Sequence, residues 1–204
     1  MIKHDAWGKS EERIYTFEHW RNNKKFSAES GMIATAYEGE VSQRFFQFLK
    51  LYLYYPSSGL YGCPLAMTDG AAFLTKHLLS TSHPDDEELK QAMSHLTSRD
   101  PKQFWTSGQW MTERAGGSDV SAGTQTVARF VDGETYELSG TKWFTSAIDS
   151  EMTYTLGRVD GKLALFFAKV QNLDGSLNGI QMIRLKDKLG TRQLPTAELI
   201  LDGM

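Results

Sequence analysis

The chain has 204 residues, of which 40% are hydrophobic and 23% charged, with 22 Lys and Arg against 25 Asp and Glu. This composition is that of a globular protein and excludes extensive disorder, while the net charge of -3 argues against binding driven by a nucleic-acid backbone. The single cysteine, Cys63, excludes an intramolecular disulfide and suits a reducing compartment.

No secretory signal or membrane span is predicted. The first residues carry mixed charge, without the basic and then apolar order of a signal peptide. The most apolar stretch, 45–55, is interrupted by Gln47 and Lys50 and is well short of the roughly 20 apolar residues that a span needs. We expect a soluble intracellular protein, mitochondrial or cytoplasmic.

Residues 32–54 carry the first clear helical pattern. Large apolar residues recur there at steps of three and four: Ile33, Tyr37, Val41, Phe45, Phe48 and Tyr52. This spacing predicts one helix with a broad buried face, which ends before Pro56 because proline breaks the hydrogen-bond ladder. The short basic run 21–25 before it is interpreted as a solvated loop.

Two more helices are predicted before residue 101. The pattern over 66–79 indicates one, and Pro84 followed by the acidic run 85–88 marks the start of another. Acidic side chains favour the first turn of a helix because its free N–H groups and dipole attract negative charge. The acidic run is therefore interpreted as a helix start, and the five histidines have no metal-ligand spacing, so we expect no metal site.

The second half of the chain predicts an antiparallel sheet. Asp132-Gly133 and Asp160-Gly161 are each flanked by strand-like segments and predict two hairpins, and Asp174-Gly175 marks a weaker third turn. Regular strands without intervening helices are typical of a small barrel or sandwich. We therefore expect an α+β chain of two domains, helical over 1–100 and an antiparallel β-barrel over 101–204.

Two segments of the β half are candidates for a ligand site. In 110–120, paired glycines before Ser118 and Asp119 form a turn whose N–H groups and hydroxyl can converge on a phosphate. In 140–146, two aromatic residues followed by two hydroxyls can face a planar ligand. Each segment alone is explained as well by an ordinary turn or by a strand with core aromatics.

Together the two segments resemble the acyl-CoA dehydrogenase family, in which they lie in the middle β-barrel domain and hold FAD. The resemblance implies that Phe144 stacks on the flavin and that Ser146 lies near its reactive nitrogen, or, with a shift of one residue, Trp143 and Thr145. The cofactor-binding residues that it implies are Met111, Thr112, Gly117, Ser118, Trp143, Phe144, Thr145 and Ser146.

Four further features extend the resemblance. Arg114, where most members have proline, and the Gly116-Gly117 pair are similar to the AidB-like branch, as is the segment 56–68. The segment 188–199 resembles the end of the family's middle domain. One member of this branch is associated with DNA, but here only the basic run 21–25 would support that partner, so we do not expect nucleic-acid binding.

The resemblance implies α,β-dehydrogenation of acyl-CoA thioesters with FAD as the electron acceptor. The family's catalytic base lies in a C-terminal helical bundle that we expect to be missing, so no catalytic residue is assigned and the chain alone is expected to be inactive. The complete protein is expected to bind acyl-CoA or a fatty acid and to form a homo-oligomer. The alternatives are a non-catalytic acyl-CoA or fatty-acid binding regulatory protein of the same fold, and a truncated product without stable function.

Overall fold

The computed structural model describes residues 1–8, 10–39 and 42–204 and divides the chain into two compact units. One unit, Thr16–Ser107, is helical, and the other joins Met1–Tyr15 to Gly108–Met204 and is mainly β-structure. The predicted α+β class is confirmed. We expected a single boundary at residue 100 and did not predict that the first fifteen residues group with the β unit.

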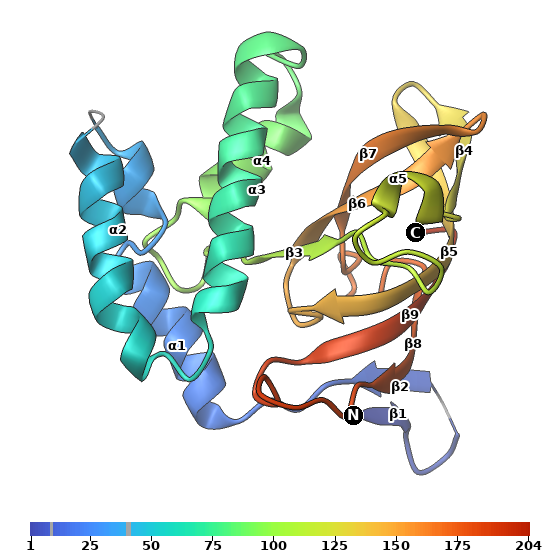
Figure 1. The fold of residues 1–204 in the computed structure, drawn as a ribbon, viewed down its shortest axis with the longest axis horizontal. Helices are drawn as coiled ribbons and strands as arrows, with labels where there is room; N and C mark the ends of the chain where they lie inside the picture. Colours follow the sequence, from blue (N-terminus) through green and yellow to red (C-terminus); the bar gives the residue numbers. More distant parts are fainter. Residues whose placement is uncertain (9, 40–41) are drawn as a thin grey trace. The chain divides into compact units, whose positions relative to one another are not determined.

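The helical unit contains four α-helices among its described residues: α1 (Glu18–Glu29), α2 (Ser42–Tyr54), α3 (Gly62–Thr81) and α4 (Glu87–Leu96) (Figure 1). Two short 3₁₀ helices, Ala34–Tyr37 and Tyr55–Ser57, lie on either side of α2. Helix α3 packs against α4. The acidic run begins α4 as predicted, because the Asp86 side chain accepts a hydrogen bond from the Leu89 N–H at 2.9 Å.

The predicted secondary structure of two segments of the helical unit was wrong. Residues 32–54 form a 3₁₀ turn and α2 instead of one helix, and Val41 lies outside the described residues. The basic run 21–25 lies within α1 instead of a loop. Asn23 is buried there, and its polar atoms are satisfied: its amide donates to the His19 carbonyl oxygen, and its own oxygen accepts from the Tyr54 hydroxyl at 2.6 Å.

The face of α2 that was expected to be buried is exposed in the structure. Gln47, Leu51 and Tyr54 face the interior instead. The Gln47 amide donates to the Met32 carbonyl oxygen at 3.0 Å and to the Asp69 carboxylate at 3.2 Å, so the buried side of α2 is held partly by polar contacts. The exposed apolar residues of this helix are Phe45, Phe46, Phe48, Leu49, Tyr52 and Leu53.

The β unit is built on a seven-stranded curled sheet in the described part of the chain, with the order β3-β6-β4-β5-β9-β8 and with β7 paired to β6 (Figure 1). Its strands are β3 (Ser107–Trp110), β4 (Val127–Asp132), β5 (Thr135–Ser146), β6 (Met152–Val159), β7 (Lys162–Lys169), β8 (Ile180–Leu185) and β9 (Thr196–Asp202). The short helix α5 (Val120–Gly123) lies between β3 and β4.

Both predicted hairpins are confirmed. Strands β4 and β5 pair across Asp132-Gly133, and β6 and β7 pair across Asp160-Gly161, where both turn residues have positive φ. The third turn, at Gly175, connects β7 to β8, which are not neighbours in the sheet. The sheet is also not purely antiparallel, because β4 and β6 make a parallel pairing through Val127 and Arg158.

Buried side chains of several strands form the core of the β unit, including Trp110, Leu138, Met182, Leu199 and Leu201. The N-terminal hairpin of β1 (Ile2–His4) and β2 (Ser10–Arg13) leads into this unit. The Glu12 carboxylate accepts a hydrogen bond from the Met182 N–H at 2.7 Å, and Ile14 packs against the core. These contacts explain why residues 1–15 group with the sheet.

Among the described residues, no helix has both the length and the apolar character needed to cross a membrane.

Two glycines of α3 should respond oppositely to alanine. A Cβ at exposed Gly70 would meet nothing within 4 Å, whereas a Cβ at Gly62 would lie 2.5 Å from the Tyr55 ring. Because glycine lowers helix propensity, Gly70→Ala should raise the free energy of unfolding by about 0.5–1 kcal/mol. Gly62→Ala should lower it by about 1–3 kcal/mol through steric overlap. Chemical denaturation of both variants tests the pair, and equal changes of one sign would contradict the described packing.

Candidate functional site

The two candidate segments, separated in sequence, lie side by side in the β unit. The Trp143 N–H donates to the Thr112 carbonyl oxygen at 3.0 Å. The backbones of Glu113 and Lys142 pair as an isolated antiparallel β-bridge. Their side chains also form an ion pair of 2.7 Å, with Glu113 4% and Lys142 0% exposed. A buried ion pair therefore fixes the start of the glycine-rich segment to the strand that carries the aromatic pair.

The Glu113 carboxylate accepts hydrogen bonds from four donors. They are the Gln125 N–H at 2.6 Å, the Thr126 N–H at 3.2 Å, the Thr126 hydroxyl at 2.6 Å and the Lys142 ammonium. Burial raises the pKa of Glu113, but hydrogen bonds from Lys142, Thr126 and the Gln125 N–H outweigh this and hold that pKa below its ordinary value. Glu113 is thus an ionised structural carboxylate and not a candidate base.

Lys142 completes this buried cluster. Its ammonium also donates to the Leu156 carbonyl oxygen at 2.7 Å, which connects β5 to β6. Burial lowers the pKa of Lys142 by more than its contact with Glu113 raises it. The cluster orients two segments around the site without offering either charge to a ligand.

A β-bulge in β5 decides which side chains of 142–146 are accessible. Lys142 lies opposite Leu199 and Thr145 opposite Ala197, so three steps along β5 match two along β9. The extra residue breaks the alternation of faces, and both Lys142 and Thr145 are buried. As a result Trp143 and Phe144 both lie on the outer side, half-buried and 44% exposed respectively.

The structure separates the two sets of residues implied by the resemblance. The Thr145 hydroxyl is fully buried and donates to the Ala197 carbonyl oxygen. The Trp143 ring is covered by the Lys186 ammonium, 3.6 Å from its centroid. Phe144 is open, and the half-buried Ser146 hydroxyl lies 3.0 Å from that of Thr196. Phe144 and Ser146 therefore have the better access.

The glycine-rich segment forms a tight turn followed by α5. Glu113 and Gly116 exchange backbone hydrogen bonds of 3.2 Å, and the Asp119 side chain accepts from the Ala122 N–H at the start of α5. A Cβ at Gly116 would lie 2.7 Å from the Gly123 Cα, so this pair of glycines permits the close approach of the two backbones.

The neighbouring residues of this segment face open space. A Cβ at Gly117 would meet nothing within 4 Å, and Ser118 is exposed. Within the described ranges, the hydroxyls of Ser118 and Thr112 make no hydrogen bond to the protein. Met111 and Thr112 are half-buried at the end of β3. These hydroxyls are available to an external acceptor.

The sequence did not reveal the two cationic side chains near the site, Arg184 and Lys186, or their buried partner Glu198. Lys186 donates to the buried Glu198 carboxylate at 2.8 Å, and Arg184 donates to the same oxygen at 2.9 Å. Burial raises the pKa of Glu198, but these two hydrogen bonds outweigh it and the pKa is lowered. A glutamate within the apolar strand 197–201 was the available signal, because a buried carboxylate requires a cationic partner.

The residues that the structure describes include no group of three or more His, Cys, Asp or Glu side chains that could hold a metal ion.

Comparison with known proteins identifies a family and two relatives of the chain. Residues 108–204 match the family model of the acyl-CoA dehydrogenase middle domain. The chain is 48% identical over 213 residues to acyl-CoA dehydrogenase family member 11 of Caenorhabditis elegans, covering 98% of this chain and 34% of the relative. It is 36% identical over 140 residues to the AidB protein of Escherichia coli (strain K12), which covers 67% of this chain and 26% of that relative.

Solved structures agree with these matches. The crystal structure of Caenorhabditis elegans ACDH-11 in complex with C11-CoA superposes with a TM-score of 0.93 at 46% identity, over 99% of this chain and 36% of that one. A glutaryl-CoA dehydrogenase from Mycobacterium smegmatis in complex with FADH2 shares the fold alone, with a TM-score of 0.63 at 18% identity, over 92% and 47%. The chain spans about a third or less of the length of its curated relatives.

The buried pair predicts a non-additive pattern of stability. Glu113→Gln leaves the Lys142 ammonium buried without a carboxylate, so it should cost about 3–5 kcal/mol of the free energy of unfolding. Combining it with Lys142→Met removes the isolated charge and should restore much of that loss. Urea unfolding of the single and double variants measures the coupling, and additive losses would contradict the described pair.

The lowered pKa of Glu113 also predicts an acid-sensitive contribution to stability. A carboxyl group with a depressed folded pKa stabilises the fold above its unfolded pKa, and the contribution is lost as pH falls through the folded value. The wild-type melting temperature should therefore fall as pH decreases below about 4.5, the ordinary value for Glu. The Glu113→Gln/Lys142→Met variant should lose less over that range in parallel thermal melts, and an equal loss would exclude this role.

Proposed function

The chain belongs to the acyl-CoA dehydrogenase family, and we propose that its β unit binds FAD as part of a flavoprotein that dehydrogenates acyl-CoA thioesters. Residues 1–100 would then contain part of the N-terminal helical domain, and 101–204 the middle domain. The chain covers about a third of its curated relatives, and the activity proposed is that of the complete protein.

The observation that carries the proposal is the arrangement of accessible groups around the buried Glu113–Lys142 pair. The exposed Phe144 ring and the unpaired hydroxyls of Thr112 and Ser118 lie on segments that this pair joins. A flat aromatic ring can stack on Phe144, while hydroxyls and N–H groups suit a pyrophosphate. The residues present therefore fit the chemistry of FAD.

We assign the roles as follows. Phe144 stacks on the isoalloxazine, and the Ser146 hydroxyl faces its polar edge. Thr112 and Ser118 donate to the flavin and its pyrophosphate, and Gly117 and Met111 form the adjacent wall. Trp143 and Thr145 have supporting roles instead, because the Trp143 ring is covered by Lys186 and the Thr145 hydroxyl is already bonded within the sheet.

Bound FAD would supply the two-electron acceptor for α,β-dehydrogenation. The chain's own residues would bind and orient the cofactor and shield one side of its ring from water. No residue is proposed as the base, because Glu113 is buried and accepts four hydrogen bonds. An acyl-CoA thioester is the proposed ligand, and the complete protein is proposed to be a homo-oligomer.

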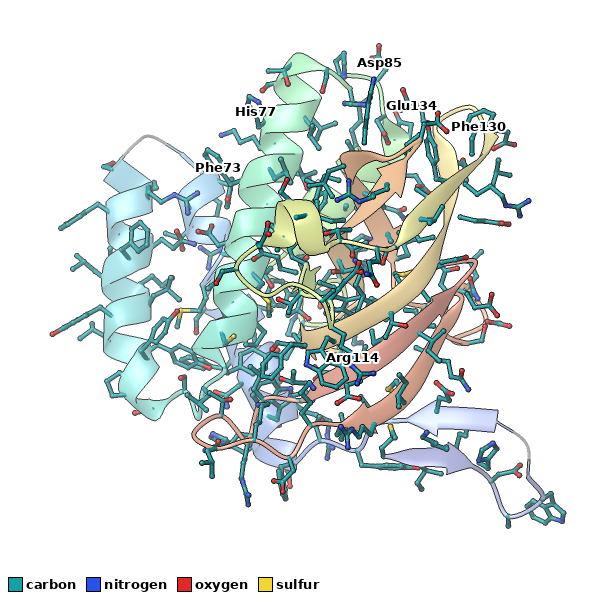
Figure 2. The ribbon with its side chains drawn as sticks, turned by 45° about the vertical axis from the view of Figure 1, so that its right-hand side comes forward. Phe73, His77, Asp85, Arg114, Phe130 and Glu134 are labelled. Carbon is teal, nitrogen blue, oxygen red and sulfur yellow. The ribbon has the colours of Figure 1, made fainter. Side chains whose placement is uncertain are left out.

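Retention of FAD by the 204-residue chain tests the proposal. The chain is mixed with FAD, desalted and measured by visible absorbance, and a titration gives the dissociation constant. Phe144→Ala should weaken FAD binding on the order of tenfold, since the proposed stacking of the flavin on this aromatic ring is lost. The matched control is Phe130→Ala, because Phe130 is also exposed but lies near the tip of the β4–β5 hairpin, well apart from Arg114 (Figure 2).

Equal weakening by both variants would contradict the assigned role of Phe144. Absence of retained FAD in the wild-type chain would contradict flavin binding by this unit. A subsequent acyl-CoA titration of the same sample would then test the alternative, a non-catalytic acyl-CoA binding protein.

A further inference from the structure

Lys186 lies directly after β8 and contacts both aromatic rings of the site. Its ammonium is 3.6 Å from the centroid of Trp143 and 5.5 Å from that of Phe144. It also donates to the Glu198 carboxylate at 2.8 Å, with side-chain exposures of 12% for Lys186 and 5% for Glu198. A largely buried carboxylate thus holds a cation on the ring next to the proposed stacking residue.

The backbone around β9 explains this placement. Strand β8 has a register shift beside β9, where Met182 pairs with Leu199 but Arg184 pairs with Glu198. The bulge in β5 lies at the same level of β9, between Leu199 and Ala197. The Lys186 N–H then donates to the Thr196 carbonyl oxygen at 2.8 Å, so the backbone that carries the ammonium is itself fixed.

Two other cations near the site differ from Lys186. Arg184 binds the same Glu198 oxygen at 2.9 Å, but its side chain is 65% exposed and makes no ring contact within the described residues. The exposed Arg114 has its guanidinium carbon 5.5 Å from the centroid of Trp143. Of the two cations bound to Glu198, Lys186 is therefore the one whose charge lies at the rings.

We propose that Lys186 is a positioning residue of this site: held by Glu198, it fixes the plane of Trp143 and leaves Phe144 as the ring on which a flat cofactor stacks. A cation over an aromatic face is attracted to the ring and excludes another ligand from that face. The same charge favours the more negative, reduced form of a flavin bound at Phe144. This second consequence rests on the proposed FAD function, whereas the first does not.

The flavin-free test measures acrylamide quenching of Trp143 fluorescence in the 204-residue chain. The signal of Trp143 is obtained in each background as the difference from the matching Trp143→Phe variant. Lys186→Met should raise the quenching constant of this signal roughly twofold, because the ring loses the cation that covers it. Lys186→Arg should preserve the wild-type value, as should Arg184→Met, which removes a charge from the same carboxylate without touching a ring.

Unchanged quenching in Lys186→Met, or an equal rise in Arg184→Met, would overturn the positioning role. If Lys186→Met fails to fold because the buried Glu198 carboxylate loses its lysine partner, the Lys186→Met/Glu198→Gln double variant provides the same comparison without a charged group at position 198. The expected rise in the double variant supports the role, and its absence overturns it.

The second test compares the dissociation constants of oxidised and reduced FAD by anaerobic titration. Lys186→Met should reduce the preference for reduced FAD on the order of threefold to tenfold, with recovery in Lys186→Arg and little change in Arg184→Met. An unchanged preference in a flavin-binding variant would overturn the electrostatic part. Failure of every variant and the wild type to bind FAD would count against the proposed function, and the quenching result would still decide the role of Lys186.

Discussion

The buried ion pair of Glu113 and Lys142 is the constraint on which the site depends. Two opposite charges removed from water are tolerated only when their remaining hydrogen-bonding capacity is satisfied. Here the carboxylate accepts from Gln125 and Thr126, and the ammonium donates to the Leu156 carbonyl oxygen. Satisfying one pair therefore fixes the glycine-rich turn, the start of β4 and the neighbouring strands β5 and β6 in one arrangement.

Strand β9 provides a second constraint on the same surface. Both of its neighbours, β5 and β8, have register shifts beside the stretch from Ala197 to Leu199. The shift in β5 places two consecutive aromatic residues on the outer side, and the end of β8 delivers a lysine to them. Bulges commonly re-aim side chains beside functional sites, and here two of them act on one pair of rings.

The helical unit has a different balance of polar and apolar contacts. It includes a partly buried ion pair between Arg44 and Asp69 at 2.6 Å, and the Asp69 carboxylate also accepts hydrogen bonds from Tyr37 and Gln47. Burial raises the pKa of Tyr37 to about 12. The apolar face of α2 is exposed among the described residues. Helical periodicity alone therefore did not identify the face that packs.

The sequence by itself determined the features that depend on local chemistry. Asp-Gly pairs specified two hairpins because their residues accept positive φ, and an acidic run specified the start of α4. The two candidate segments also indicated the family, since their residue types and spacing are a local pattern. The α+β class followed from the change of periodicity along the chain.

Only the tertiary structure decided which residues of those segments are accessible at the surface. Sequence left Trp143 and Phe144 as alternatives, because an inserted residue in a strand depends on pairing with a distant partner, here β9. The Glu198–Lys186 contact and the burial of Asn23 also depend on packing between separate elements. Local patterns specify turns and caps, whereas the register and burial that build this site arise from contacts between residues far apart in the chain.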